Sequence, residues 1–268
     1  MEAVKHLNNA MLNARVTVQK TAGSLIVTSA IQRGEGEVGL AQADVVYLAY
    51  RKGTLTDPYP HVNLRGVAVG GLNRFCVYVR RDAPIHTIAD LRGKRVAIAP
   101  VGTAGELLSR MVLEAYGITY TDVELKVHPI HEMGSSFAGE QLDAMIMVGS
   151  FDPETYPQPA RARDLRLLGV ERDVINHLRS QYPFVKPAIV KWRGDHDRAV
   201  DVQTVGADTL VICRKDLPED LVYRLTKALI ADTQVRERFS IDADNAPATP
   251  IPLHPGAARF YRELQLLK

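Results

Sequence analysis

The order of polar and apolar residues between positions 90 and 117 predicts a strand, a small-residue loop and a helix in succession. Residues 96–99 form a short apolar run of the kind found in buried strands. Small residues fill 100–105, and from Glu106 apolar residues recur at helical spacing until Gly117. Such a helix start directs unpaired N–H groups and a positive dipole end at whatever lies in front of it. The stretch indicates an anion-binding loop, although an ordinary strand-to-helix turn gives the same pattern.

Similar patterns recur along the chain and define the other expected elements. The remaining helices are predicted at 2–12, 24–33, 45–50, 134–141, 174–182, 218–239 and 257–267. The remaining strands are predicted at 16–19, 38–41, 64–69, 75–79, 124–127, 143–148, 165–169 and 207–213. Residues 51–63, 152–159 and 191–204 are polar or proline-rich and are expected to be loops. Strands that alternate with helices predict an α/β fold with a parallel-type sheet covered by helices.

Small or polar residues follow four of the predicted strands. In sheets of this type, ligands bind beyond the carboxyl ends of the strands. The candidate ligand-binding residues are therefore Gly23, Ser24, Gln42, Ala43, Asp44, Gly102, Thr103, Ala104, Gly149 and Ser150. Ser24 and Thr103 would add hydroxyl donors to the N–H groups of two helix starts.

Two segments share the order apolar strand, basic pair and aspartate, and they suggest two domains. They read FCVYVRRDAPI and LVICRKDLPED. We interpret them as strands by which the chain leaves one lobe and returns to it, which predicts a hinge of two crossover strands. Lobe I would comprise 1–80 and 206–268, and lobe II would comprise 81–205.

Composition narrows the class of protein. The 268 residues are 46% hydrophobic and 24% charged, with a net charge of +2, so no large basic field for nucleic acid is expected. No apolar run approaches the length of a membrane span, and the start of the given chain has no signal-peptide core. Cys76 and Cys213 lie in apolar runs and are expected to be buried thiols, although a disulfide stays open.

Several segments together resemble the solute receptors of TAXI-type TRAP transporters. They are VTVQKTAGS, GEGEVGLAQADVVYLAY, TIADLRGKRVAIAPVGTAGE, YPFVKPAIV, TVGADTLVICRKDLPEDLVYRLTKAL and IPLHPGAARFYRE, in this order. The resemblance implies a type II periplasmic-binding-protein fold whose two lobes close on a small carboxylate, such as glutamate or 2-oxoglutarate, in the cleft between them. It also implies delivery to a membrane permease, a periplasmic or extracytoplasmic location, and neither a catalytic group nor a cofactor.

The chain departs from this family pattern in three places. A signal peptide, a first strand and a glycine-rich loop usually precede the helix that here starts at Glu2. Val27 stands where the family usually has asparagine, and Thr103-Ala104-Gly105 stands where it tends to have Ser-Gly-Thr. These differences leave the identity of the ligand more open than the fold.

Two alternatives remain open from the sequence. One is a sensor or binding protein of the same fold without a transport role. The other is an enzyme, for which His128, His131 and Glu132 would suggest a metal site and Asp44 a base. His-x-x-His without further ligands is more often a loop edge, and a carboxylate at a helix start is first a cap. No metal site is therefore expected.

Overall fold

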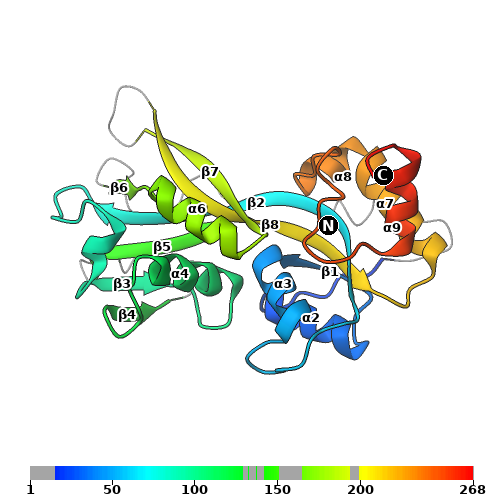
Figure 1. The fold of residues 1–268 in the computed structure, drawn as a ribbon, viewed down its shortest axis with the longest axis horizontal. Helices are drawn as coiled ribbons and strands as arrows, with labels where there is room; N and C mark the ends of the chain where they lie inside the picture. The colour runs from blue at the N-terminus through cyan, green and yellow to red at the C-terminus, as the bar shows by residue number, and fades with distance from the viewer. Residues whose placement is uncertain are drawn as a thin grey trace. The chain divides into compact units, whose positions relative to one another are not determined.

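The computed structural model describes residues 16–128, 132, 137, 142–150, 165–193 and 199–267. The chain divides into two compact units, the first comprising 1–71 and 208–268 and the second comprising 72–207 (Figure 1). The predicted helices at 2–12 and 134–141 and the predicted loop at 152–159 lie wholly or mostly outside the described residues.

Unit 1 is built on strands from distant parts of the chain. Strand β1 (Val38–Gln42) pairs antiparallel with β8 (Val200–Arg214), and β8 neighbours β2 (Leu64–Arg80). The register runs from Val38 opposite Cys213 to Gln42 opposite Thr209. Helices α2 (Ser24–Arg33) and α3 (Ala43–Lys52) flank β1 in sequence, and a Cβ on Gly39 would overlap Val27. Glycine at position 39 therefore lets α2 pack directly against β1.

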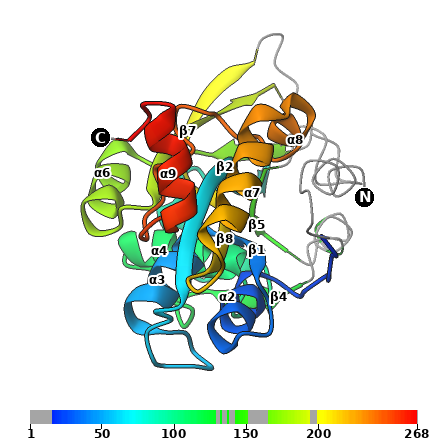
Figure 2. The ribbon, with the colours of Figure 1, turned by 90° about the vertical axis from the view of Figure 1, so that its right-hand side faces the viewer.

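The C-terminal helices complete the core of unit 1. Helices α7 (Glu219–Ala231) and α9 (Pro255–Glu263) lie side by side in Figure 2, and α8 (Thr233–Arg238) follows α7. Their apolar faces bury Leu225 and Phe260, while the buried Tyr261 hydroxyl donates to the Val67 carbonyl oxygen at 2.8 Å. This bond anchors the last helix to β2.

Unit 2 has a mixed sheet. Strand β3 (Arg95–Ile98) pairs in parallel with β4 (Glu124–Val127) and β5 (Ala144–Gly149). Strand β2 pairs antiparallel with β5 and with β6 (Leu165–Leu168), and β7 (Val185–Trp192) pairs antiparallel with β8. The expectation of a parallel-type sheet therefore holds for β3 and its two neighbours, whereas the long strands β2 and β8 pair antiparallel with β5, β6, β1 and β7.

Helices α4 (Ala104–Ala115) and α6 (Arg172–Gln181) pack against each other in unit 2, after the short 3₁₀ helix η1 (Ile88–Leu91). The core includes Tyr78, Met145 and Trp192, and the rings of Tyr78 and Trp192 meet edge to face with centroids 5.8 Å apart. Such aromatic pairs stabilise a core beyond the area that they bury.

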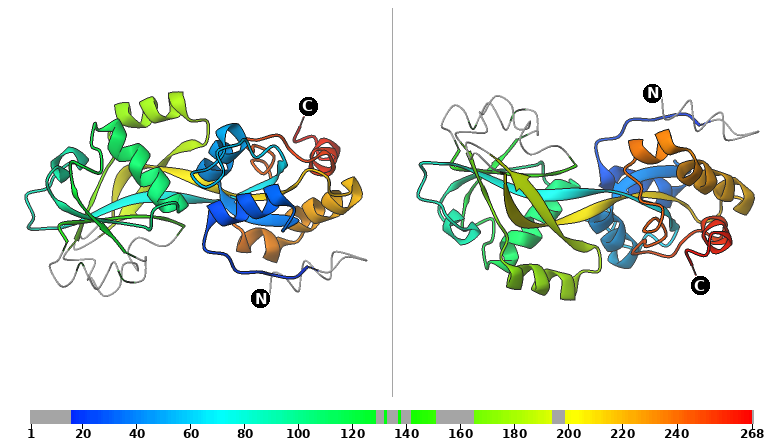
Figure 3. Two further views of the ribbon diagram at one scale, coloured as in Figure 1. Left: turned by 90° about the horizontal axis from the view of Figure 1, so that it is seen from below. Right: turned by 90° about the horizontal axis from the view of Figure 1, so that it is seen from above.

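The two long strands differ from the prediction. Residues 64–69 and 75–79 belong to one continuous strand, β2, and within the predicted loop 191–204 residues 191–192 end β7 and 200–204 begin β8 (Figure 3). Exposed Asp201 and Gln203 alternate with partly or fully buried residues. The sequence of a strand with one solvent-exposed face contains many polar residues and so resembles that of a loop. Pro187 lies within β7. Proline in a sequence argues against a strand assignment, because it is found in sheets mainly at edge strands.

Two other predictions were wrong. Residues 16–19 form no strand, and 17–19 are exposed. The predicted helix 218–239 is two helices, because Asp232 adopts an extended conformation and its carboxylate accepts bonds from Gln234 N and Val235 N. The capping carboxylate of Asp232 therefore starts a new helix, α8, at a point where the spacing of apolar residues in the sequence shows no interruption.

The cysteines are buried thiols, as expected. Cys76 lies in β2 and Cys213 in β8, and burial raises the pKa of each thiol to about 12. Among the described helices, none is long and apolar enough to cross a membrane.

Candidate functional site

Unit 1 brings together the first two groups of candidate residues. Ser24 begins α2 and Gln42 ends β1, and the Gln42 backbone N–H donates to the Ser24 Oγ at 3.0 Å. The Ser24 hydroxyl proton has no acceptor within the described part of the chain, and Ser24 is partly exposed. Ser24 can therefore donate to a bound molecule.

The start of α2 has the form of an anion-binding site. Its N-cap is Gly23, whose φ of 133° is rarely adopted by other residues and which has no side chain to cap the helix. A Cβ at Gly23 would have no atom within 4 Å, and Gly23 and Ser24 are partly exposed. The first-turn N–H groups of a 10-residue helix are thus accessible to an anion.

Gln42 links the start of α2 to a buried carboxyl group, that of Asp44. Asp44 is fully buried in the first turn of α3, where its Oδ2 accepts from Gln42 Nε2 at 3.0 Å and its Oδ1 from Val45 N at 2.7 Å. Burial raises the pKa of Asp44 to about 7, although both hydrogen bonds act in the opposite direction. Ala43, between them, is buried and opens α3.

Unit 2 brings together the other two groups. Strands β3 and β5 are parallel neighbours, so the loop Gly102-Thr103-Ala104 that follows β3 and the pair Gly149-Ser150 at the end of β5 lie at the same edge of the sheet. A Cβ on Gly105 would lie 3.3 Å from Ala99 Cβ and 3.8 Å from Val148 Cβ. Glycine at position 105 lets α4 start close to both strands.

The start of α4 differs from that of α2, because a carboxylate of the chain already binds there. Glu106 is buried, and its Oε2 accepts from Gly102 N at 3.2 Å. Its Oε1 accepts from Arg110 Nε at 3.1 Å and from the Tyr120 hydroxyl at 2.8 Å. The Thr103 hydroxyl donates to the Pro100 carbonyl oxygen at 2.7 Å, and its Oγ1 accepts from Glu106 N at 3.3 Å. Thr103 therefore acts as a helix cap, with its proton already donated.

Sequence reasoning overlooked two residues near these loops. Glu106 stands three positions after Thr103, which is the spacing of a capping box and a readable signal. Arg74 is half-buried on β2 and lies opposite Gly149 in the antiparallel register. Its charge lowers the pKa of Cys76, against the larger effect of burial. The polar pair Asn73-Arg74 ahead of an apolar strand was the available signal.

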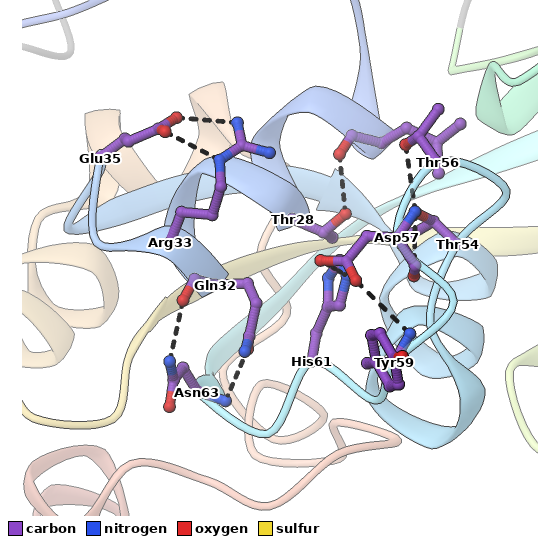
Figure 4. A network of polar contacts seen from close by, with 11 residues as sticks. Thr28, Gln32, Arg33, Glu35, Thr54, Thr56, Asp57, Tyr59, His61 and Asn63 are labelled. Atoms are coloured by element: carbon purple, nitrogen blue, oxygen red, sulfur yellow. Dashed lines mark hydrogen bonds and ion pairs between the residues drawn. The ribbon is translucent and has the colours of Figure 1, made fainter.

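A second polar network in unit 1 holds a loop against α2 and α3 (Figure 4). Asn63 donates from its backbone N to Gln32 Oε1 at 3.0 Å and from Nδ2 to the Gln32 carbonyl oxygen at 2.8 Å. The fully buried His61 lies with Nε2 3.3 Å from Asp57 Oδ2, and burial lowers its pKa. These contacts explain the loop geometry without a ligand.

No group of three or more histidine, cysteine, aspartate or glutamate residues in the described ranges could hold a metal ion. Of the histidines considered for a metal site, His128 is described and partly exposed, whereas His131 lies outside those ranges.

Comparison with solved structures supports the fold. The protein XAC2383 from Xanthomonas citri, bound to chloride ion, is 15% identical with a TM-score of 0.61, over 98% of this chain and 87% of that one. PhnD1 from Prochlorococcus marinus, in complex with methylphosphonate, is 10% identical with a TM-score of 0.61, over 98% and 91%. The effector-binding domain of a BenM variant is 12% identical with a TM-score of 0.52, over 92% and 91%.

The chain thus has the mixed α/β, two-lobed fold of periplasmic-binding-protein-like structures. The model of the NMT1-like family matches residues 2–264, which is nearly the whole chain. The protein therefore belongs to the NMT1-like family.

Proposed function

We propose that this protein is the solute receptor of a TRAP-type transporter and that its solute is a small carboxylate, such as glutamate or 2-oxoglutarate. The observation that carries this proposal is the start of α2, where the N-cap Gly23 has no side chain and Gly23 and Ser24 are partly exposed. Such a start stabilises an anion without the cost of burying a lysine or arginine. The two-lobed fold supports a binding role and no catalytic one.

The remaining candidate residues contribute unequally to this proposal. In unit 1, Gln42 donates a backbone hydrogen bond to Ser24, and Asp44 accepts one from the Gln42 side chain. In unit 2, Gly149 and Ser150 stay candidates for ligand contact, whereas Gly102 and Thr103 first serve Glu106 and the cap of α4. We therefore assign the carboxylate to the α2 start. TRAP permease subunits would be the membrane partner and the location would be extracytoplasmic.

Isothermal titration with L-glutamate, 2-oxoglutarate and glutarate tests this assignment. Ser24→Ala removes one charge-assisted hydrogen bond, and we expect roughly tenfold weaker binding. Ser180→Ala is the matched control, because the Ser180 hydroxyl is exposed on α6 and donates only to the His177 carbonyl oxygen. Equal affinity in wild type and Ser24→Ala, or no binding of any of these carboxylates, would refute the assignment.

A ligand sensor of the same fold is the second candidate, favoured by the similarity to the effector-binding domain of BenM. The two roles differ in the membrane partner. A receptor restores solute uptake when it is added to vesicles that contain its permease, whereas a sensor binds the solute without supporting uptake.

A further inference from the structure

The Gln42 side chain is oriented by the carboxyl group behind it. A carboxamide has a donor end and an acceptor end, and an ionised carboxylate can only accept. With Nε2 donating to Asp44 Oδ2 at 3.0 Å, the Oε1 of Gln42 must face the other way. That oxygen accepts no hydrogen bond from any residue in the described part of the chain. Because the Gln42 backbone N–H donates to Ser24 Oγ at 3.0 Å, this acceptor belongs to a residue that adjoins the start of α2.

Protonation of Asp44 would reverse this arrangement. A protonated Oδ2 is a donor, and the stable partner for it is the amide oxygen. The Gln42 amide would then turn over, so that Oε1 accepts from Asp44 and the NH₂ group faces outward. The Asp44 Oδ1 keeps its bond from Val45 N in both states.

Charged groups near Asp44 have other partners or act on it weakly. The bonds that Asp44 accepts come from Gln42, Val45 and its own backbone N–H, and no charged side chain is among the causes of its pKa shift. Titratable groups on the elements around α3 are Arg33 at the end of α2, Glu35 after it, Asp57 and His61 in the loop after α3, and Asp208 on β8. Arg33 pairs with Glu35 and His61 with Asp57. Burial thus dominates the behaviour of this carboxyl.

We propose that Asp44 is a positioning residue that determines whether Gln42 presents an acceptor or a donor to the solute. With Asp44 ionised, the site favours a carboxylate that carries a neighbouring donor, as in a 2-amino acid, over a 2-oxo acid. The ligand class rests on the proposed function, because it takes the carboxylate to be held at the α2 start. The amide orientation rests on the hydrogen bonds alone.

Spectra of the ligand-free protein test the orientation directly. The Asp44 side-chain ¹³C resonance and the Gln42 side-chain ¹⁵N resonance are followed across pH, with Gln42→Leu used for assignment. We expect one common midpoint, near the Asp44 pKa of about 7. In Asp44→Asn the Gln42 resonance should lose this step, and in the control Asp57→Asn it should keep it. A Gln42 resonance that stays constant while Asp44 titrates in the wild type would overturn the proposal, even if Asp44→Asn does not fold.

Titration with L-glutamate and 2-oxoglutarate tests the ligand class. The net charge of each compound stays nearly constant between about pH 5.5 and about pH 8.5, so a pH-dependent change in their relative affinity reports on the protein. We expect the preference for glutamate to fall roughly tenfold from the higher to the lower pH, and to be independent of pH in Asp44→Asn. An unchanged preference in the wild type would refute this part. If neither compound binds, the proposed function fails and the ligand class with it, while the ligand-free spectra still decide the orientation.

Discussion

Replacing Asp44 with asparagine should stabilise the protein, and more so as the pH rises. The buried carboxyl has a folded pKa of about 7, against 3.8 for the unperturbed group. Between these values the folded state holds a proton that the unfolded state has lost, so stability falls as the pH rises and levels off above the folded pKa. The shift corresponds to about 4 kcal/mol at most, of which about 2.5 kcal/mol falls between pH 5 and pH 8.

Asparagine has the same shape as aspartate and carries no charge, so the variant escapes this loss. Urea unfolding of the wild type and Asp44→Asn at a series of pH values measures the effect. The difference in the free energy of unfolding should grow with pH in favour of the variant. A difference that is constant from pH 5 to pH 8, or that shrinks with pH, would show that Asp44 is ionised throughout and that burial does not control it.

Three further predictions concern other parts of the chain. Thr103→Val should destabilise unit 2 by about 1 kcal/mol, because it removes the cap that accepts from Glu106 N, and hydrogen exchange in α4 measures the loss. Burial lowers the pKa of folded His61, so His61 costs the protein stability as the pH falls below the pKa of unfolded histidine. His61→Gln should remove this cost, so the free energy of unfolding should fall less steeply on acidification. An acid transition that stays unchanged would argue against this role. Leu40→Lys should leave the melting temperature nearly unchanged and reduce self-association in light scattering, because Leu40 is 46% exposed on a terminal strand of the sheet.

The sequence predicted the elements whose hydrophobic period was clear and uninterrupted. Helix α2 and strands β4 and β5 lie within a residue or two of their predicted bounds. Failures occurred where a tertiary contact or a local bond decides the structure. The 218–239 pattern does not reveal that Asp232 binds two backbone N–H groups, and the polar face of β8 resembles a loop until its neighbour is known.

The candidate site shows the same division. The spacing correctly placed Ser24 and Gln42 at element ends, and the sheet explains why they meet. Pattern alone treated the starts of α2 and α4 as equivalent. They differ because Glu106 folds back onto Gly102 N, while no residue in the first turn of α2 is acidic. The pattern of residues alone does not distinguish the two helix starts.

The two ends of unit 2 meet on adjacent strands, and this gives the chain a modular organisation. Asn73 Nδ2 donates to the Ala207 carbonyl oxygen at 3.2 Å, and a Cβ on Gly70 would lie 3.3 Å from the Thr209 carbonyl oxygen. A short turn that joins Gly71 to Asp208 would therefore turn the unit 1 portions of β2 and β8 into a hairpin. The pairing of segments now separated by more than half the chain would become local, and such a shortened chain should refold faster than the full protein.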